Sequence, residues 1–363
     1  RRHWPLNATF QNGPNWGKDV FMPLAWIIGG ERLAGQGWRM LMECLAAGRS
    51  ISLPSSAVGY AKLAARSTGG YARIRNQFKL PIGRFEGVEE ALATIGGHLY
   101  LMDAARRMTA GAIDLGEKPS VISAIVKYHL TERGRTVVNA AMDVLGGKGI
   151  CLGPSNFMGR AYQQLPIAIT VEGANILTRS LIVFGQGAIR CHPYVLPEMK
   201  AARDEDRYRA SRDFDAAFWA HVRHSAANAV RALFHGLTGA VFAGSPTGAA
   251  PELRTYYCRA TRYSAALAIA ADVSMLALGG SLKRREKLSA RLGDVLALLY
   301  LVSSVLKRYE DEGRRREDLP FVHWSVQHAL FGIEDALEGL VENYPSRLLG
   351  AAPVSYTHLT LPT

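Results

Sequence analysis

Apolar and polar residues alternate with helical spacing over most of the chain, beginning near residue 38. Small residues dominate the first helical stretch, residues 38–76, in which Pro54 predicts a kink or the start of a new helix. Apolar positions recur three and four residues apart from Val88 to about Leu115, and again from Pro119 to the glycine pair Gly146–Gly147. Small residues along a helix face allow close approach, so these stretches predict one closely packed helical group.

A second helical group follows a boundary marked by Pro193 and Pro197. Its apolar run from Leu292 to Leu306 is interrupted by Asp294 and is too short to span a bilayer, so we interpret it as a core helix. Two antiparallel helix groups, each burying its own apolar stripe, are the simplest architecture for this pattern. The helices expected in the second group cover residues 212–236, 252–278, 283–310 and 321–342.

The two ends of the chain lack the helical period. Residues 1–37 are rich in glycine, proline and asparagine and contain one strand-like piece, Lys18–Met22, which Pro23 ends. We interpret them as the remnant of a β-rich domain that lies upstream, since the chain begins at Arg1 rather than at a methionine. Residues 354–363 have no continuity with the preceding pattern, and we interpret them as a non-native tail. The expected fold class is mainly α.

Composition places the chain among globular proteins and narrows its partners. The 363 residues are 48% hydrophobic and 20% charged, which provides apolar material for a sizeable core. The formal net charge of +12 suits nucleic acid, an anionic membrane surface or a polyanionic ligand such as coenzyme A, and no nucleic-acid-binding motif supports the first. The four cysteines form no metal-binding pair and suit a reducing compartment: Cys44, Cys151, Cys191 and Cys258.

A single carboxylate, Glu172, follows a short β-branched run and precedes Gly173. The run, Ile167–Val171, indicates a buried extended segment or a tight approach to a helix. Hydrophobic neighbours and the lack of a cation before Arg179 predict partial desolvation, which makes a carboxylate a better base near neutral pH. A glutamate in the first turn of a helix also complements the helix dipole, and this plainer interpretation is not excluded by spacing.

Two further stretches offer groups that suit phosphates. Arg75 stands close to the aromatic Phe78 at the end of a helix, and a guanidinium binds a pyrophosphate in a bidentate manner. The turn from Asp143 to Gly149 is rich in glycine, which lets a backbone approach a phosphate or a flat ring. A surface arginine and an ordinary helix end are the plainer interpretations, and the turn matches neither a P-loop nor a dinucleotide-binding fingerprint.

Isolated charged and histidine residues are open to structural interpretations. Arg49 lies in an apolar helix and needs either a structural ion pair or a ligand. His192 and His235 stand alone among helices and are expected to be packing or surface residues. The basic clusters Lys283–Arg285 and Arg314–Arg316 are flanked by acids, so a solvated face is expected first and an anionic membrane surface second.

Taken together, the order and spacing of these features resemble the C-terminal half of the acyl-CoA dehydrogenase family. Within it, the sequence is most similar to the bacterial long-chain, FadE-type branch, which carries an extra C-terminal helical domain. The resemblance covers about residues 1–350, and its landmarks are Gly35–Trp38, Arg49, Arg75–Phe78, Leu145–Gly149, Val171–Gly173 and Ile182–Tyr194. It implies the end of a middle β-domain at 1–37, a four-helix domain at 38–194 and a helical extension at 195–350.

The resemblance also implies roles for individual residues. Glu172 would remove the α-proton of an acyl-CoA while the β-hydrogen leaves as hydride to FAD, giving a trans-2-enoyl-CoA. Arg49 and Gly173 would contact the substrate. The residues implied in FAD binding are Arg75, Gln77, Phe78, Glu86, Asp143, Gly146, Gly147 and Ala174. The chain departs from the family pattern at four of its landmark positions, namely Val171 for Tyr, Ala174 for Thr, and Glu86 and Asp143 for Gln.

The partners that follow are a medium- or long-chain acyl-CoA, an electron-transferring flavoprotein as acceptor, and a second copy of the chain, because the family's arginine reaches FAD across a subunit interface. We expect a cytoplasmic protein with peripheral contact to the inner face of the membrane, no nucleic acid and no metal. The alternatives are an acyl-CoA oxidase, and a helical scaffold or membrane-associated module without catalysis. Without the upstream domains, we expect this stretch alone to bind FAD poorly and to be inactive.

Overall fold

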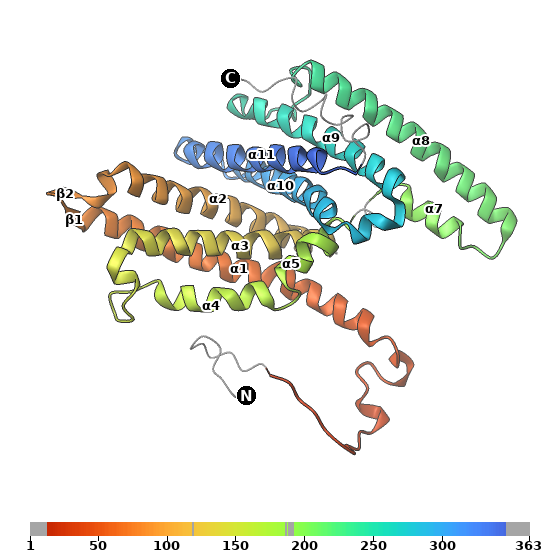
Figure 1. The fold of residues 1–363 in the computed structure, drawn as a ribbon, viewed down its shortest axis with the longest axis horizontal. Coiled ribbons are helices and arrows are strands. Elements are labelled where there is room, and N and C mark those ends of the chain that lie inside the picture. The colour runs from red at the N-terminus through yellow and green to blue at the C-terminus, as the bar shows by residue number, and fades with distance from the viewer. Residues whose placement is uncertain (1–12, 118–119, 186, 188–191, 346–363) are drawn as a thin grey trace. The chain divides into compact units, whose positions relative to one another are not determined.

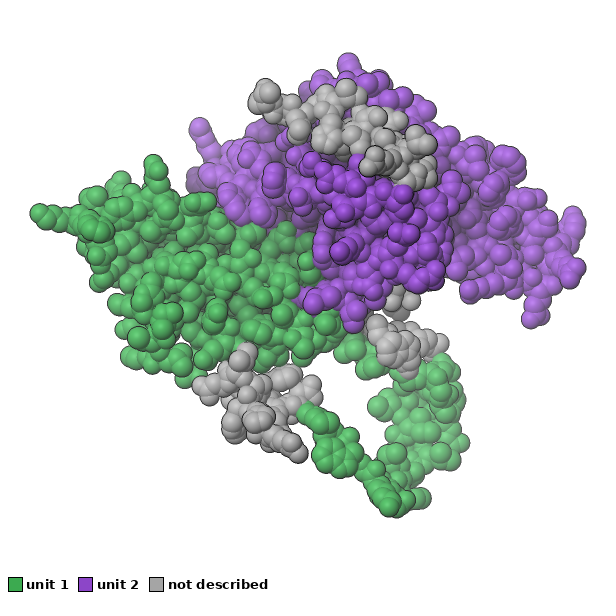
Figure 2. Space-filling model, in the orientation of Figure 1, with its two compact units in different colours: residues 1–99, 109–174 green, residues 100–108, 175–363 purple. Residues whose placement is uncertain are grey.

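A computed structural model describes residues 13–117, 120–185, 187 and 192–345, apart from the side chains of residues 38, 39, 42, 43, 46 and 47. The chain divides into two compact units (Figure 2). Unit 1 comprises residues 1–99 and 109–174, and unit 2 comprises residues 100–108 and 175–363. The described residues are mostly helical, so the expected fold class is confirmed.

Unit 1 is built from long helices and one short hairpin (Figure 1). The hairpin is antiparallel, with Asn76 opposite Pro81 and Gln77 opposite Leu80. Residues 100–108 in the middle of α2 belong to unit 2. The elements are α1 (Gly37–Ile74), β1 (Asn76–Gln77), β2 (Leu80–Pro81), α2 (Glu86–Asp114), α3 (Ser120–Leu145) and α4 (Gly159–Thr170), with short 3-10 turns at Leu24–Trp26, Glu31–Leu33, Ile82–Arg84 and Gly146–Gly149.

Small residues set the spacing between the helices of unit 1. Ala57, Ala61 and Ala64 lie on one side of α1 and are fully buried. On α3, a Cβ added to Gly134 would lie 3.3 Å from the Cβ of Ala57 and 3.5 Å from a methyl group of Leu165 on α4. The close packing expected from the small residues is therefore confirmed, and α1 continues through Pro54 without a new helix beginning there.

Unit 2 is organised around α10 and α11. Leu292, Val295 and Leu301 of α10 and Ile333 of α11 are fully buried, which confirms the core helix predicted over residues 292–306. Asp294, the acid within that run, is paired with Arg179, whose Nε donates to both carboxylate oxygens and whose Nη2 donates to Oδ2. The elements are α5 (Asn175–Leu177), a π-helical turn (Thr178–Val183), α7 (Val195–Ala201), α8 (Arg207–Leu237), α9 (Arg254–Leu278), α10 (Glu286–Asp311) and α11 (Leu319–Glu342), with short 3-10 turns at Pro251–Leu253, Gly279–Arg284 and Arg316–Asp318.

Two stretches of unit 2 are long and apolar enough to cross a membrane by length and composition alone: Pro251–Arg284 and Glu286–Asp311. The second is α10, whose helix extends beyond the apolar run on both sides. The whole helix is therefore long enough to span a bilayer, although the apolar run of residues 292–306 alone is too short. Most of the apolar residues of α10 are nevertheless buried.

Several sequence-based expectations were wrong in detail. Lys18–Met22 forms no strand, since no described segment pairs with it and the side chains of Phe21 and Met22 are exposed. The run of residues 167–171 is not extended, because it forms the last turn of α4 and its cap. A helix is also expected from about Ala174 to Ile189; residues 175–183 are helical, as α5 and the π-helical turn, while 186, 188 and 189 lie outside the described residues. The expected tail at 354–363 lies outside the described residues.

Candidate active site around Glu172

Glu172 lies in the tight turn between α4 and α5, outside any helix. The interpretation as a first-turn helix residue is therefore wrong. The backbone of Glu172 is left-handed, with φ 54°, and that of Gly173 has φ 99°. Glycine adopts this region freely, but a glutamate there costs on the order of 1–2 kcal/mol, and such strain persists only where the surroundings hold it.

The carboxylate of Glu172 lies against a glycine on α1. A Cβ added to Gly48 would be 3.2 Å from Oε1 and 3.6 Å from Oε2, so glycine at this position leaves room for the acid. Oε2 is buried and has no hydrogen-bond partner among the described residues. A buried oxygen without a donor is costly, and it is available to accept a proton from a ligand.

Two buried cations surround the same turn. Arg49 of α1 is 6% exposed, and no described carboxylate lies within ion-pair distance of it, so the expected structural ion pair is not found in that part of the chain. Its Nε is buried and has no hydrogen-bond partner among the residues that the structure describes. Lys127 of α3 is fully buried, and its Nζ donates to the carbonyl of Gly173 at 2.7 Å.

Burial lowers the pKa of Lys127 to about 8. The charge of Arg49 lowers it further, while the carboxylates of Glu172 and Glu132 raise it. Lys127 therefore carries its charge at neutral pH at a cost, because a desolvated ammonium loses the hydration that it has in water.

Hydrogen bonds from other elements fix α4, which carries the turn. The hydroxyl of Tyr60 on α1 donates to Oε1 of Gln164 at 2.5 Å. Oδ1 of Asn156 accepts from the backbone N–H of Met158 and Gly159, where α4 begins. The start and the middle of α4 are thus held by hydrogen bonds within unit 1.

Most of the residues predicted to bind the cofactor lie elsewhere, around the hairpin that follows α1. Arg75, Gln77 and Glu86 are exposed, and no described acid forms an ion pair with Arg75. Phe78 is 88% exposed and left-handed, with φ 49°, and its ring meets Phe85 edge-on at 6.3 Å between centroids. An exposed guanidinium beside an exposed ring is suited to a ligand from outside the chain.

The glycine turn predicted to bind the cofactor lies at the end of α3. A Cβ added to Gly146 or Gly147 would meet nothing within 4 Å, so the backbone is open to a large group. Asp143 is exposed on the last turn of the helix. The Nζ of Lys148 lies 5.3 Å from the centre of the Tyr71 ring.

An apolar cluster joins the hairpin to the glycine turn. Its buried members are Ala72 of α1, Ile82 after the hairpin and Val144 of α3. Seven of the eight predicted cofactor residues are thereby placed at one end of unit 1. The eighth, Ala174, lies instead beside Glu172 and Gly173.

The residues around the hairpin and those around Glu172 are far apart along α1, the longest described helix. Arg75 follows Arg49 by 26 positions, and α1 is helical between them. At the usual helical rise this corresponds to roughly 39 Å, more than an extended dinucleotide can bridge. The residues at the hairpin end are suited to bind the phosphates of a dinucleotide, and Glu172 at the other end is suited to accept a proton. The two ends of one chain are too far apart to contact the same bound dinucleotide.

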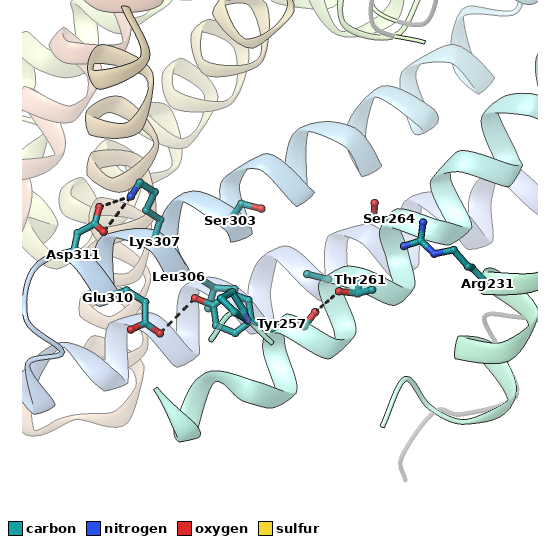
Figure 3. Close-up of a pocket in the computed structure, with 11 residues that line it drawn as sticks. Arg231, Tyr257, Thr261, Ser264, Ser303, Leu306, Lys307, Glu310 and Asp311 are labelled. Carbon is teal, nitrogen blue, oxygen red and sulfur yellow. Dashed lines mark hydrogen bonds and ion pairs between the residues drawn. The ribbon is translucent and has the colours of Figure 1, made fainter. Parts of the chain in front are cut away.

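A separate hollow of about 570 Å³ lies in unit 2 between α8, α9 and α10 (Figure 3). Two cations, Arg231 and Lys307, line it; Lys307 is paired with Asp311 at 2.8 Å, and the hydroxyl of Tyr257 donates to Glu310. Burial, together with the Glu310 carboxylate, raises the pKa of Tyr257 to about 12, so it stays protonated. Cations and acids in the lining offset each other, and none of the sequence-predicted site residues lines it.

His192 is not an isolated packing residue, because it belongs to a polar cluster in unit 2. Its Nε2 lies 3.0 Å from Oδ1 of Asp272, and its Nδ1 accepts from the backbone N–H of Tyr194 and Val195. His221 lies beside the same aspartate and contacts Glu198 at 2.8 Å. Because Nδ1 of His192 accepts hydrogen bonds, Nε2 carries the hydrogen and donates a hydrogen bond to Asp272. The polar groups of His192 therefore have hydrogen-bond partners within the cluster.

Two residues at the site were not predicted from the sequence: Lys127 was not identified as a site residue, and Gly48 was noted only as one of many small residues. Lys127 is the one formally charged residue between Val121 and Leu130, in a stretch otherwise built for burial. A lone charge in a buried helical stripe is the signal that was available. The closeness of Gly48 to the acid could not be read, because it depends on the turn of a segment 124 positions later.

Comparisons with known proteins place both units in one family. Residues 35–185 match the family described as Acyl-CoA dehydrogenase, C-terminal domain. Residues 189–354 match the family described as Acyl-CoA dehydrogenase, C-terminal, bacterial type. Together the two matches span most of the chain.

Individual relatives either share low sequence identity with the chain or match only a small part of it. The chain is 62% identical to Protein HemX of Proteus mirabilis over 68 residues, which is 19% of this chain and 40% of the relative. It is 27% identical to 3-(aryl)acrylate reductase of Clostridium sporogenes over 147 residues, 40% of this chain and 38% of the relative. An acyl-CoA dehydrogenase from Bacillus anthracis, solved with FAD, shares the fold with a TM-score of 0.68 at 20% identity, covering 91% of this chain and 54% of that one. The chain thus matches about two fifths of these curated relatives and about half of that structure.

Proposed function

Because this chain belongs to the acyl-CoA dehydrogenase family, we propose that it is the base-bearing part of an FAD-dependent enzyme that converts an acyl-CoA to a trans-2-enoyl-CoA. One observation carries the proposal: the carboxylate of Glu172, in a left-handed turn, presents a buried oxygen that has no donor among the described residues. An acid held in this way suits proton abstraction better than structural support, because a structural carboxylate has its hydrogen bonds filled.

The reaction needs a base and a polarised carbonyl. The α-carbon of a thioester is a weak acid, so its proton moves to Oε2 of Glu172 only as charge is stabilised on the thioester oxygen. We assign the backbone N–H of Glu172 to that oxygen, in keeping with the family resemblance. FAD, when bound, supplies the acceptor for the hydride that leaves the β-carbon.

The nearby cations have separate parts in this scheme. Arg49, buried and without an ion pair among the described side chains, is assigned to the substrate, in keeping with the family resemblance. The net charge of +12 suits the phosphates of coenzyme A and FAD. Gly173 lets the chain turn sharply beside the thioester.

The cofactor-binding end of unit 1 serves a second copy of the chain. Arg75 binds the phosphates, Gln77, Phe78 and Glu86 flank them, and the open Gly146–Gly147 turn with Asp143 receives the dinucleotide. Because about 39 Å of helix separates Arg75 from the Glu172 turn, the flavin that meets one chain's base is held by the partner's arginine. This arrangement requires a homodimer.

Substrate range, acceptor and location complete the proposal. We propose a medium- or long-chain acyl-CoA and an electron-transferring flavoprotein, with the basic clusters of unit 2 touching an anionic membrane surface. An acyl-CoA oxidase, in which oxygen accepts the electrons, remains the alternative within the enzyme class, and a non-catalytic helical module the alternative outside it. The reductase among the relatives makes the direction of reaction a further point to test.

Anaerobic mixing of the full-length natural protein with octanoyl-CoA or palmitoyl-CoA tests these alternatives. We expect the oxidised flavin absorbance to bleach and the matching enoyl-CoA to appear by mass spectrometry. Reoxidation by an electron-transferring flavoprotein but slowly by oxygen would identify a dehydrogenase, and rapid reoxidation by oxygen an oxidase. A colourless protein that binds no flavin would overturn the enzyme proposal and leave the scaffold.

A further inference from the structure

Lys127 occupies a position that is unfavourable for a lysine. Its side chain is fully buried on α3, a helix in which Ile125 and Leu130 are buried as well. Burying an ammonium costs free energy unless specific partners compensate, and a hydrophobic residue of similar size would avoid the cost. A role that depends on the ammonium is therefore the natural place to look for its purpose.

The ammonium of Lys127 reaches the turn that carries the proposed base. Its Nζ donates to the backbone carbonyl of Gly173 at 2.7 Å. This carbonyl belongs to the second of two consecutive left-handed residues, Glu172 and Gly173. A charge-assisted hydrogen bond from a buried donor is one of the stronger contacts available to hold a backbone in an uncommon conformation.

Oε2 of Glu172 has no hydrogen-bond partner among the described residues, and the glycine beneath it, Gly48, contributes space rather than a contact. The orientation of the side chain therefore depends on the backbone of the turn. The turn meets α3 through the hydrogen bond from Lys127.

We propose that Lys127 is a positioning residue for Glu172: by binding the Gly173 carbonyl, it holds the left-handed turn that keeps the carboxylate over Gly48. The inference rests on the proposed function, in which Glu172 is the base. Lys127 does not touch the reacting atoms in this scheme. It acts through the backbone of the residue that follows the base.

Charged groups from three elements face the ammonium. Arg49 of α1 repels it, and Glu172 of the turn and Glu132 of α3 attract it. The neutral amine also has N–H groups to donate, so the hydrogen bond survives loss of the charge. A substitution that removes the donor should therefore do more harm than one that removes only the charge.

The test uses the full-length, FAD-loaded protein and three variants. Lys127→Met removes the donor at similar length, Lys127→Gln keeps an N–H donor without the charge, and Ser123→Ala alters a buried residue one turn earlier on the same helix. Single-turnover flavin reduction by octanoyl-CoA gives the rate constant and the apparent substrate Kd. Hydrogen–deuterium exchange of the segment 171–175 reports on the turn without any substrate.

We expect Lys127→Met to reduce flavin about 100-fold more slowly, with the Kd and FAD content within about twofold of wild type, because a misplaced base harms chemistry before binding. Lys127→Gln should recover about tenfold of that loss, and Ser123→Ala should match wild type. Exchange at 171–175 should be faster in Lys127→Met than in Ser123→Ala.

Wild-type reduction rates and exchange in both Lys127 variants would overturn the positioning role. So would a loss confined to the substrate Kd. The two proposals fail separately: if the wild-type protein itself does not dehydrogenate acyl-CoA, the proposed function is wrong, while exchange at 171–175 still decides whether Lys127 holds the turn.

Discussion

At the residue scale, the chemistry depends on a carboxylate held where the backbone leaves room for it. Glu172 takes a conformation that glutamate rarely adopts, beside a helix that has glycine at the point of contact. Neither feature stabilises the fold. Strain without structural gain, at a residue with an unfilled buried oxygen, is the pattern expected where function has set the geometry.

The contact between Gly48 and the acid can be tested by adding one methyl group. In Gly48→Ala the new Cβ would lie 3.2 Å from Oε1 of Glu172, so the carboxylate must move by a few tenths of an ångström. We expect flavin reduction by acyl-CoA to slow by about tenfold, since small displacements of a base are costly. Gly59→Ala on the same helix, where an added Cβ meets nothing within 4 Å, is the control. Equal rates in the two variants would show that the contact is unimportant.

Lys127 also gives a prediction for stability against pH. Its pKa is about 8 in the folded chain, against an ordinary lysine value of 10.5, so the folded state binds fewer protons between these values. Stability from this group therefore rises with pH, by up to about 1.4 kcal/mol per unit, from pH 8 to 10.5. Below pH 8 the full cost of the buried charge is present.

Denaturant unfolding of wild type and Lys127→Met at pH 7 and pH 9.5 measures this effect. We expect the wild type to gain about 2 kcal/mol relative to the variant between the two pH values. The tyrosines of raised pKa are present in both proteins, so their contribution cancels in this comparison. A difference between the proteins that is constant with pH would mean that Lys127 keeps an ordinary pKa.

At the element scale, helical periodicity located most of the long helices. The patterns expected at 88–115, 252–278 and 321–342 correspond to α2, α9 and α11 within a few residues. The errors occurred where local pattern and tertiary context differ. The strand-like residues 18–22 have no pairing partner among the described segments. The β-branched run 167–171 forms the end of α4 and its cap, and hydrogen bonds from Tyr60 and Asn156 hold that helix.

The start of α8 offers a test of local helix stability. Oδ1 of Asp206 accepts from the backbone N–H of Tyr208 and Arg209, which fills donors that a helix start leaves open. Asp206→Ala should lower the stability of α8 by about 1 kcal/mol, seen as faster hydrogen exchange in its first turns. Asp213→Ala, which removes only an exposed ion pair with Arg212, should change it by less than about 0.5 kcal/mol. Equal effects would mean that Asp206 does not act as a cap.

At the scale of the whole molecule, the length of α1 separates two kinds of site residue. The hairpin end gathers the groups suited to phosphates, and the other end gathers Glu172, Arg49 and Lys127. The sequence resemblance named most of these residues, because order and spacing along a chain are preserved in a linear pattern. Which of them meet in space, and the part of Lys127, depended on helix packing and were not readable.

Mixing two inactive variants tests the shared site directly. Arg75→Ala should weaken FAD binding, and Glu172→Gln should abolish proton abstraction. A purified mixed dimer carries one site that has both residues, so we expect about half of the wild-type activity, although each variant alone is nearly inactive. If the mixed dimer is as inactive as its parents, both residues serve the same site within one chain.

The central claim is that Glu172 is the base, and the most direct measurement is flavin reduction by octanoyl-CoA in the Glu172→Gln variant of the full-length protein. The amide keeps the size of the side chain but cannot accept the α-proton. We expect wild-type FAD content and substrate binding, with the rate constant for flavin reduction lowered by about 1,000-fold or more. Reduction at close to the wild-type rate would contradict the account.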